Sequence, residues 1–415
     1  MGKQGKRFNL GRKPHKPRWF LKIVEHVASL FFCWFTNAHV KTDKEVRKLK
    51  RPYIILSTHS SFADFPMLAK GIMPKTTGWV VSIEEFRRGN IMFGIGSIPK
   101  RRFTPDLSTT KNILYFVKKL KRSCAIYPEA RFSLCGITEQ ISPSIGKLCK
   151  KCNVSVVLFK SNGSYVNSPQ WNKHPYRRCR QEAKISLLFT KEQIKTLSAE
   201  EIQQTIEQVL QRDEYQWQFD NKIHTKCKKR ANGLHKILYK CPSCKTEFKT
   251  NSSGIHLWCE HCGAKWEMDT LSRLHGLNTD KGFEHIPDWY NWERNEVKQE
   301  VINGSYHFED DVRIEDCFHK RIKFINFGHG KVVHDKNGFE IKGTTLDGEP
   351  FNLIKPILEN SSLHIEYNFI KRGPCFEISN EKGTYFFYLQ NNKNAITKLH
   401  FATEELYKHY VLNEQ

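Results

Sequence analysis

A histidine and an aspartate, His59 and Asp64, have the residue types and the spacing that acid–base chemistry requires. They follow the apolar run 53–56, which is short enough for a buried strand, so His59 is expected where that strand ends. Ligand-binding residues of α/β sheets collect at this position. A histidine works as a general base when a partner fixes its tautomer, and Asp64 suits that role if the chain turns between the two residues. The structural alternative is a capping box beginning at Ser61, with His59 as a loop residue.

Four blocks in order resemble the glycerolipid and lysophospholipid acyltransferases, the 1-acylglycerol-3-phosphate acyltransferase group. His59-x4-Asp64 resembles the HX4D motif of that family. The run 96–102 (Gly-Ser-Ile-Pro-Lys-Arg-Arg) is similar to its second block, and the run 127–133 (Tyr-Pro-Glu-Ala-Arg-Phe-Ser) to its third. The apolar run 154–158 is similar to the fourth, with serine where the family has proline. The resemblance covers roughly residues 45 to 220, about two-fifths of the chain.

This resemblance implies a glycerolipid-acyltransferase-like α/β domain. It would move a fatty acyl group from acyl-CoA or acyl-carrier protein to the free hydroxyl of a lysophospholipid such as 1-acylglycerol-3-phosphate. His59 would be the general base oriented by Asp64, and no covalent enzyme intermediate is needed. The residues that the resemblance assigns to substrate binding are Gly96, Arg102, Glu129 and Arg131.

The implied roles of the charged substrate residues have structural alternatives. Arg102 closes a basic triplet, and an arginine fork suits a phosphate dianion, although a basic triplet is also typical of a solvated loop. Glu129 and Arg131 follow a strand and a proline, so both are expected near His59. Glu129 would hold backbone or acceptor hydroxyl groups and Arg131 would face phosphate; the alternative is an ion pair that braces the site. Ala130 stands where the family has glycine, a departure that concerns the acceptor more than the reaction.

Charge and cysteine content point to an anionic partner and to a metal. The formal net charge of +24 indicates nucleic acid, an anionic membrane surface, or phosphorylated and CoA-type substrates. Thirteen cysteines in a chain of 415 residues, several in Cys-x-x-Cys pairs, indicate a reducing compartment rather than a disulfide framework. A third pair, Cys149 and Cys152, has no partner pair and is expected to be two ordinary thiols of a helix. Two pairs with fourteen residues between them match the closed, structural Zn²⁺ site of a zinc ribbon: Cys241, Cys244, Cys259 and Cys262.

The first 47 residues read as a basic arm and an amphipathic helix. Lys3, Lys6 and Arg7 belong to an arm without acids, and the aromatic-rich segment 19–35 follows. Charges interrupt that segment, so a transmembrane helix is not expected. A basic arm before an aromatic-rich helix is typical of contact with an anionic membrane surface. The alternative is a helix packed on the protein's own core.

The rest of the chain reads as three further regions. Residues 48–222 alternate strands and helices, which predicts an α/β sheet with flanking helices. A zinc ribbon is expected over 236–272, and residues 285–415 read as a mostly β domain, a small barrel or sandwich closed by a helix near 403–410. The expected strands are 53–57, 79–82, 124–127, 154–159 and 183–189 in the α/β domain, and 331–334, 339–342, 363–369, 375–378 and 384–389 in the β domain.

Two other functions compete with a lysophospholipid acyltransferase. A nucleic-acid-binding zinc-ribbon protein would explain the charge and the ribbon, but not the ordered blocks, and no signature of RNA or DNA recognition is found. An acyltransferase fold kept for lipid binding without activity is the other. The favoured hypothesis is a cytoplasmic enzyme, peripheral on the cytosolic face of a membrane.

Overall fold

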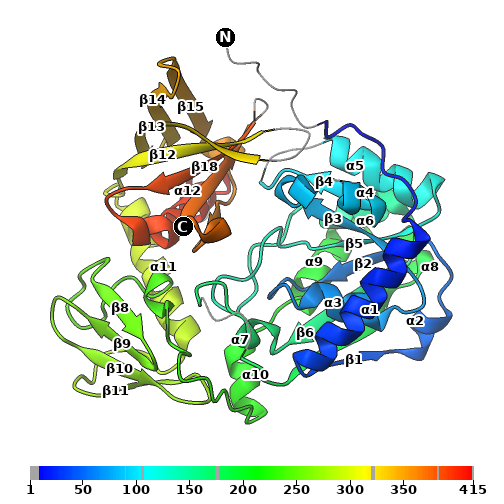
Figure 1. The fold of residues 1–415 in the computed structure, drawn as a ribbon, viewed down its shortest axis with the longest axis horizontal. Coiled ribbons are helices and arrows are strands. Elements are labelled where there is room, and N and C mark those ends of the chain that lie inside the picture. The colour runs from blue at the N-terminus through cyan, green and yellow to red at the C-terminus, as the bar shows by residue number, and fades with distance from the viewer. Residues whose placement is uncertain are drawn as a thin grey trace.

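The structure is a computed structural model that describes residues 9–88, 90–103, 107–172, 177–318, 323–380 and 383–413. The basic-arm residues Lys3, Lys6 and Arg7 lie outside the described residues. Figure 1 shows an α/β region, a small four-stranded region, and a β-rich region that ends in a helix. This confirms the predicted mixed architecture and the mostly β C-terminal part.

The α/β region is built on a seven-stranded sheet of order β1-β7-β6-β2-β5-β3-β4. Neighbouring strands run parallel except for β6 and β7, which are antiparallel. The central strand β2 is buried along its whole length, as its unbroken apolar run predicts for a strand covered on both faces. The strands are β1 (Ala38–Thr42), β2 (Ile54–Ser57), β3 (Thr77–Ser82), β4 (Ser97–Lys100), β5 (Ser123–Ile126), β6 (Val156–Asn162) and β7 (Gln181–Phe189).

Two of these strands, β1 and β4, escaped the sequence analysis. β1 was counted with the membrane-surface arm, yet it pairs in register with β7 at the edge of the sheet. β1 is half-exposed at the sheet edge, so its hydrophobic pattern is weak, and β4 is only four residues long and contains a proline.

Most of the longer helices of this region bury their apolar faces, and the first helix, described below, is the exception. Ile113, Phe116 and Val117 lie in the core beneath α5 and the π-helical turn that continues it. The spacing of Ser198 and Glu201 in the sequence is typical of a capping box. The structure forms it: the Ser198 hydroxyl accepts from the Glu201 N–H, and the Glu201 carboxylate accepts from the Ser198 N–H. The helices are α1 (Trp19–Phe35), α2 (Lys44–Lys48), α3 (Asp64–Gly71), α4 (Asn90–Gly94), α5 (Leu107–Leu114), α6 (Ile145–Cys152), α7 (Ser164–Asn167), α8 (Lys191–Thr196), α9 (Ala199–Val209) and α10 (Glu214–Asp220).

Helix α1 presents its apolar side to solvent. Trp19 and Trp34 are both 76% exposed, whereas Lys22 and Glu25 are buried against the sheet. The Lys22 ammonium donates to the Glu25 carboxylate and to the Thr77 carbonyl, 2.8 Å away, so the buried charges are paired. Among the described residues, no helix is long and apolar enough to cross a bilayer.

The four-stranded region is an antiparallel sheet of order β11-β10-β9-β8. Its strands are β8 (Thr250–Ser253), β9 (His256–Cys259), β10 (Lys265–Met268) and β11 (Leu274–Gly276). Helix α11 (Ile286–Ile302) then leads into the C-terminal β region.

The C-terminal region is one antiparallel sheet of order β15-β14-β13-β12-β18-β17-β16, with α12 (Ile396–Val411) after the last strand. The end strands β15 and β16 do not pair with each other in the described part of the chain, so the sheet is open where a closed barrel or a two-sheet sandwich was expected. Its strands are β12 (Phe308–Phe318), β13 (Lys323–Asp335), β14 (Gly338–Thr345), β15 (Pro350–Pro356), β16 (His364–Glu366), β17 (Cys375–Ser379) and β18 (Thr384–Leu389).

The ribbon and the C-terminal β region share one hydrophobic core. Trp266 of β10 packs edge-on against Trp289 of α11 at 4.9 Å between ring centroids. Phe401 of α12 meets Tyr290 of α11 in the same way at 4.6 Å. The core continues to Tyr165 of the α/β region. Separate regions along the sequence are therefore joined in the interior.

Candidate functional site

A mainly apolar cavity of about 260 Å³ opens beyond the carboxyl ends of β2 and β5. This is the edge of a parallel sheet at which α/β proteins bind ligands. His59, Arg102 and Arg131 lie on its wall, together with His364 of the C-terminal region. Apolar lining side chains are Phe62, Phe65, Trp79, Met92, Ile95 and Phe132.

The His59 ring is held between two aromatic rings. Its centroid lies 4.0 Å from that of Tyr127 and 4.2 Å from that of Phe132. Its Nδ1 atom is buried and makes no hydrogen bond to any described residue. Burial, with the positive charges of Arg212 and Arg102 nearby, lowers the pKa of His59 well below its ordinary value of 6.5. The imidazole is therefore neutral at pH 7, the form that can accept a proton.

Asp64 fixes the turn that carries His59. Its Oδ2 accepts from the backbone N–H groups of Ser60 at 2.6 Å and Ser61 at 3.1 Å. Its Oδ1 accepts from the hydroxyls of Ser161 at 2.7 Å and Ser164 at 2.8 Å. None of its hydrogen bonds within the described residues comes from the His59 ring. Asp64 thus acts on the backbone at the start of α3 and ties this turn to the end of β6.

Glu129 braces the same turn from the other side. Its carboxylate accepts from the His59 N–H at 3.3 Å and from the Glu139 N–H at 3.0 Å. The guanidinium of Arg212 donates to both of its oxygens at 2.7 Å. This fork-on-carboxylate pair is buried, so its geometry is fixed. Holding backbone groups was one of the expected uses of Glu129.

Arg102 and Gly96 come from the second block and occupy different places. The Arg102 Nη1 lies 3.3 Å from Glu84 Oε2 and 2.8 Å from Glu377 Oε2 of β17. Gly96 has φ +80° in the turn before β4, and a Cβ there would come within 2.8 Å of Pro17. Gly96 is not among the residues that line the cavity. The positive φ of this turn explains why residue 96 is a glycine, and no contact with substrate is needed to explain it.

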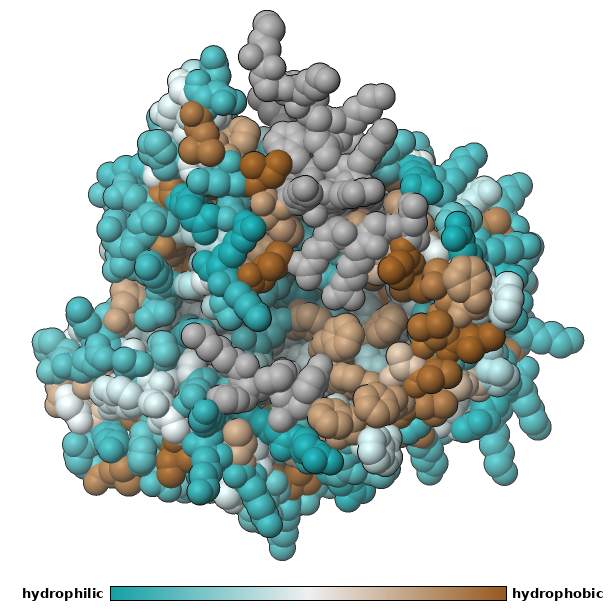
Figure 2. Space-filling view, in the orientation of Figure 1, coloured by the Kyte–Doolittle hydropathy of each residue, from teal (hydrophilic) through white to brown (hydrophobic). Residues whose placement is uncertain are grey.

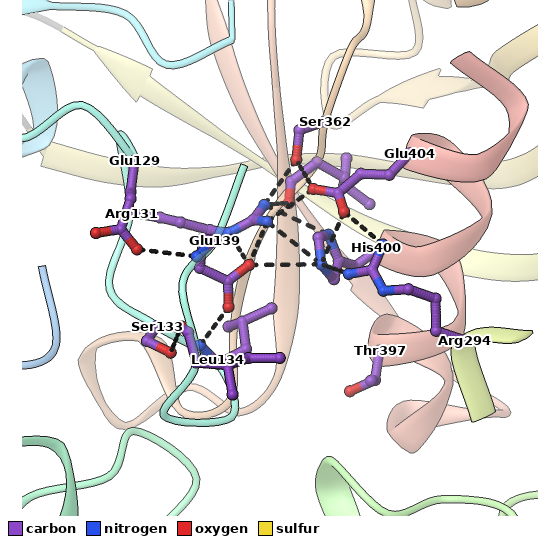
Figure 3. A network of polar contacts seen from close by, with 12 residues as sticks. Glu129, Arg131, Ser133, Leu134, Glu139, Arg294, Ser362, Thr397, His400 and Glu404 are labelled. Carbon is purple, nitrogen blue, oxygen red and sulfur yellow. Dashed lines mark hydrogen bonds and ion pairs between the residues drawn. The ribbon is translucent and has the colours of Figure 1, made fainter. Parts of the chain in front are cut away.

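Arg131 lies at the centre of a buried network between the α/β region and the C-terminal region (Figure 3). Its Nη2 donates to Glu139 at 2.7 Å and to Glu404 of α12 at 2.8 Å. Its Nη1 donates to the Ser362 hydroxyl at 2.7 Å and to the Leu363 carbonyl at 3.0 Å. Buried charges are stable only when paired in this way, and these contacts correspond to the bracing alternative for this residue.

Ala130, which replaces the family's usual glycine, has φ +59°. This is the left-handed region, which glycine enters without the clash that a Cβ causes. Ala130 thus adopts a backbone conformation that is typical of glycine.

The partners of these residues were not predicted from the sequence. Two of these partners, Arg212 and Glu214, follow helix α9. The Ser60 hydroxyl donates a hydrogen bond to Glu214 at 2.8 Å, so Ser60 has a structural role. The only indication of these two residues in the sequence is that a basic and an acidic residue directly follow an amphipathic helix. His364 and Glu377 gave no signal, because their short strands lie in a region with no recognised motif.

The four predicted metal ligands come together in the ribbon. The ligand atoms of Cys241, Cys244, Cys259 and Cys262 all lie within 4.8 Å of one another. The sulfurs of Cys241 and Cys262 are 3.7 Å apart, and those of Cys244 and Cys259 are 3.8 Å apart. A tetrahedron with Zn–S bonds of about 2.3 Å has edges of about 3.8 Å. The sulfurs therefore fit a Zn²⁺ ion with four thiolate ligands.

The third cysteine pair does not belong to that site. Cys149 and Cys152 are buried on α6 within the core of the α/β region, which fits the prediction of ordinary helix thiols.

No family model matches this chain, and no curated protein matches it. Among solved structures, the chain is similar to the 1-acyl-sn-glycerophosphate (LPA) acyltransferase PlsC from Thermotoga maritima. The two are 18% identical, the match covers 46% of this chain and 76% of that chain, and the TM-score is 0.37. At this identity and TM-score, the likeness carries no argument about the reaction.

Proposed function

We propose that the protein is an O-acyltransferase that acylates the free hydroxyl of a lysophospholipid, with His59 as general base. One observation carries the proposal: a neutral, partly buried imidazole, whose Nδ1 makes no hydrogen bond to a described residue, lies on the wall of an apolar cavity at the carboxyl ends of the parallel strands. A general base needs this protonation state and access to its substrate. The ordered acyltransferase blocks described above give the reaction class.

In the proposed reaction, His59 takes the proton of the acceptor hydroxyl while the hydroxyl oxygen attacks the thioester carbonyl of acyl-CoA or of the acylated carrier protein. A C–O bond forms, the C–S bond breaks, and the imidazolium returns its proton to the leaving thiolate. Asp64 and Glu129 support the reaction by fixing the backbone on either side of His59. We assign Arg102, which lines the cavity, to the acceptor phosphate, and Arg131 to bracing the two regions against each other.

The exposed face of α1 suits delivery of the acceptor from a membrane surface. Its aromatic and aliphatic side chains continue to the cavity through Phe62, whose ring meets that of Phe32 of α1 at 5.9 Å. In the view of Figure 2, brown hydrophobic side chains run from the hollow in the middle of the molecule towards its right-hand side. We place this face on the cytosolic leaflet of an anionic membrane.

The test is transfer from labelled acyl-CoA and acyl-carrier protein to a panel of lysophospholipids. His59→Ala is expected to lower transfer by roughly 100-fold or more, the usual contribution of a general base. The exposed His39→Ala on β1 is the matched control and should retain wild-type transfer. If the folded wild-type protein binds lysophospholipid and transfers nothing from either donor, a lipid-binding protein without activity is the better description.

A further inference from the structure

The cavity that contains His59 has one wall made by the C-terminal β region. His364 belongs to β16, is 2% exposed and lines the cavity together with His59 and Arg102. In the antiparallel pair of β16 and β17, His364 stands opposite Glu377. Opposite residues of two paired strands point to the same face, so His364 and Glu377 face the α/β region together.

Buried ion pairs fix this wall. Glu377 meets Arg102, and Glu404 of α12 meets Arg131, so each arginine on the cavity wall is tied to the C-terminal region. Figure 3 shows the second of these junctions, where Arg131 reaches Ser362 just before β16. The position of His364 beside the cavity is therefore set by charged contacts on both sides of it.

Neither ring nitrogen of His364 makes a hydrogen bond to a described residue. Its Nε2 lies 3.2 Å from Glu366 Oε1, a contact that is an ion pair only when the imidazole is protonated. Most buried polar atoms have a hydrogen-bond partner, and one left unpaired is costly. Two histidines from different regions thus line one cavity, and each has a buried ring nitrogen without a hydrogen bond to a described residue.

The charged groups around His364 leave it neutral. Burial, followed by the positive charge of Arg102, lowers the pKa of His364 well below 6.5, although Glu84 opposes this. A neutral imidazole has one N–H donor and one bare nitrogen acceptor. The N–H can donate to an ester or phosphate oxygen of the acceptor, and the bare nitrogen can accept from a further hydroxyl where the lysophospholipid carries one.

We propose that His364 is a specificity-determining residue of the cavity, which binds the glycerol head group of the acceptor opposite His59. This inference rests on the proposed function. The polar end of the cavity, at His59, Arg102 and His364, receives the head group, and the apolar end receives the acyl chain. The C-terminal β region is then part of the active site rather than an appended module.

The first experiment is steady-state kinetics with the lysophospholipid varied at saturating acyl donor. His364→Ala is expected to raise the KM for the acceptor about 10-fold, the effect of losing one or two hydrogen bonds, with kcat changed less than about threefold. His364→Gln, which keeps a donor and an acceptor at similar reach, should restore most of the affinity. His59→Ala should instead lose kcat. His307→Ala, at an exposed histidine of the same region, is the control.

The second readout is equilibrium binding of monomeric lysophosphatidic acid without any acyl donor. The dissociation constant should rise about 10-fold in His364→Ala and stay near the wild-type value in His364→Gln. If His364→Ala does not fold, His364→Asn, which is polar but too short to reach, should show the same loss.

The outcomes separate this inference from the proposed function. An active wild-type protein, with KM and dissociation constant within about twofold of wild type in the folded alanine or asparagine variant, overturns the role of His364 and leaves the acyltransferase intact. A wild-type protein that transfers nothing, but whose lysophosphatidic acid binding depends on His364, supports head-group binding and rejects the enzyme.

Discussion

At the residue scale, the environment of His59 determines the pH range in which it can act. The pKa of this ring is lowered mainly by burial, so the free-base form persists below the ordinary histidine value of 6.5. The acidic limb of kcat/KM for acyl transfer should therefore lie below pH 6.5. The measurement is a pH profile with a lysophospholipid acceptor. An acidic limb at or above pH 6.5 would contradict the proposed role of the buried imidazole.

Arg131 should matter for stability more than any exposed arginine. Its side chain is buried between Glu139 and Glu404, and Arg131→Ala would leave two buried carboxylates short of a partner. Breaking a buried ion pair costs about 3–5 kcal/mol, so the free energy of unfolding in urea should fall by about 3 kcal/mol or more. The control is Arg180→Ala, whose exposed pair with Glu182 should contribute less than about 1 kcal/mol. If Arg131→Ala lowered the free energy of unfolding as little as Arg180→Ala does, the buried network would not contribute to stability.

At the element scale, α1 is an amphipathic helix whose apolar side faces outwards. Val24 and Phe31 are 61% and 63% exposed, so replacing both by glutamate should leave the unfolding temperature nearly unchanged. The same change should remove retention on anionic liposomes, because it places charge in the surface that would enter the lipid. Co-sedimentation at low and high salt tests this. Undiminished retention in the double variant would show that another surface binds the membrane.

The ribbon should depend on its metal. Four thiolates that bind one metal ion would join the turns around Cys241 and Cys259, so zinc binding should supply folding free energy there. We expect one zinc per chain and a lower unfolding temperature after chelation or in Cys259→Ser. Cys152→Ala, from the pair in α6, should keep the zinc. Elemental analysis and thermal unfolding decide this, and full thermal stability of the zinc-free chain would contradict it.

At the scale of the whole molecule, buried histidines make stability sensitive to acid. Burial lowers the pKa of His334 to about 3, so the folded state binds fewer protons than the unfolded state below pH 6.5. The stabilisation is present above pH 6.5 and is lost as the pH falls from there towards 3. At pH 5 the loss from His334 alone is roughly 2 kcal/mol, from 1.36 kcal/mol for each pH unit.

Urea unfolding at pH 7.5 and at pH 5.0 measures this effect. The free energy of unfolding of the wild-type protein should fall by about 2 kcal/mol or more between the two values, and His334→Phe should lose much of that fall. His307→Ala, at an exposed histidine, should behave like the wild-type protein. A pH dependence that is the same in His334→Phe as in the wild-type protein would contradict the assignment.

The shared core explains why these effects reach beyond one region. Tyr239, Trp289 and Phe401 come from three parts of the chain and lie in the same buried cluster. Loss of zinc, or acidification at His334, should therefore destabilise the ribbon and the C-terminal sheet together. The wall of the cavity that carries His364 belongs to the same unit.

The sequence by itself determined the local features of this protein. Apolar spacing predicted α1 at Trp19–Phe35 and the buried strand β2, and the Ser198 capping box marked the start of α9. The spacing of the two Cys-x-x-Cys pairs predicted the sulfur cluster. These features depend on residues close together along the chain, where periodicity and capping chemistry have fixed geometric consequences.

Only the tertiary structure decided what the site residues contact. The Arg102 guanidinium meets a carboxylate 275 positions away, and Arg131 meets one 273 positions away. A local pattern can show that an arginine follows a strand, but the partner of a buried charge depends on which distant element packs against it. That packing tied both arginines to the C-terminal region, and it brought His364 to the cavity of His59.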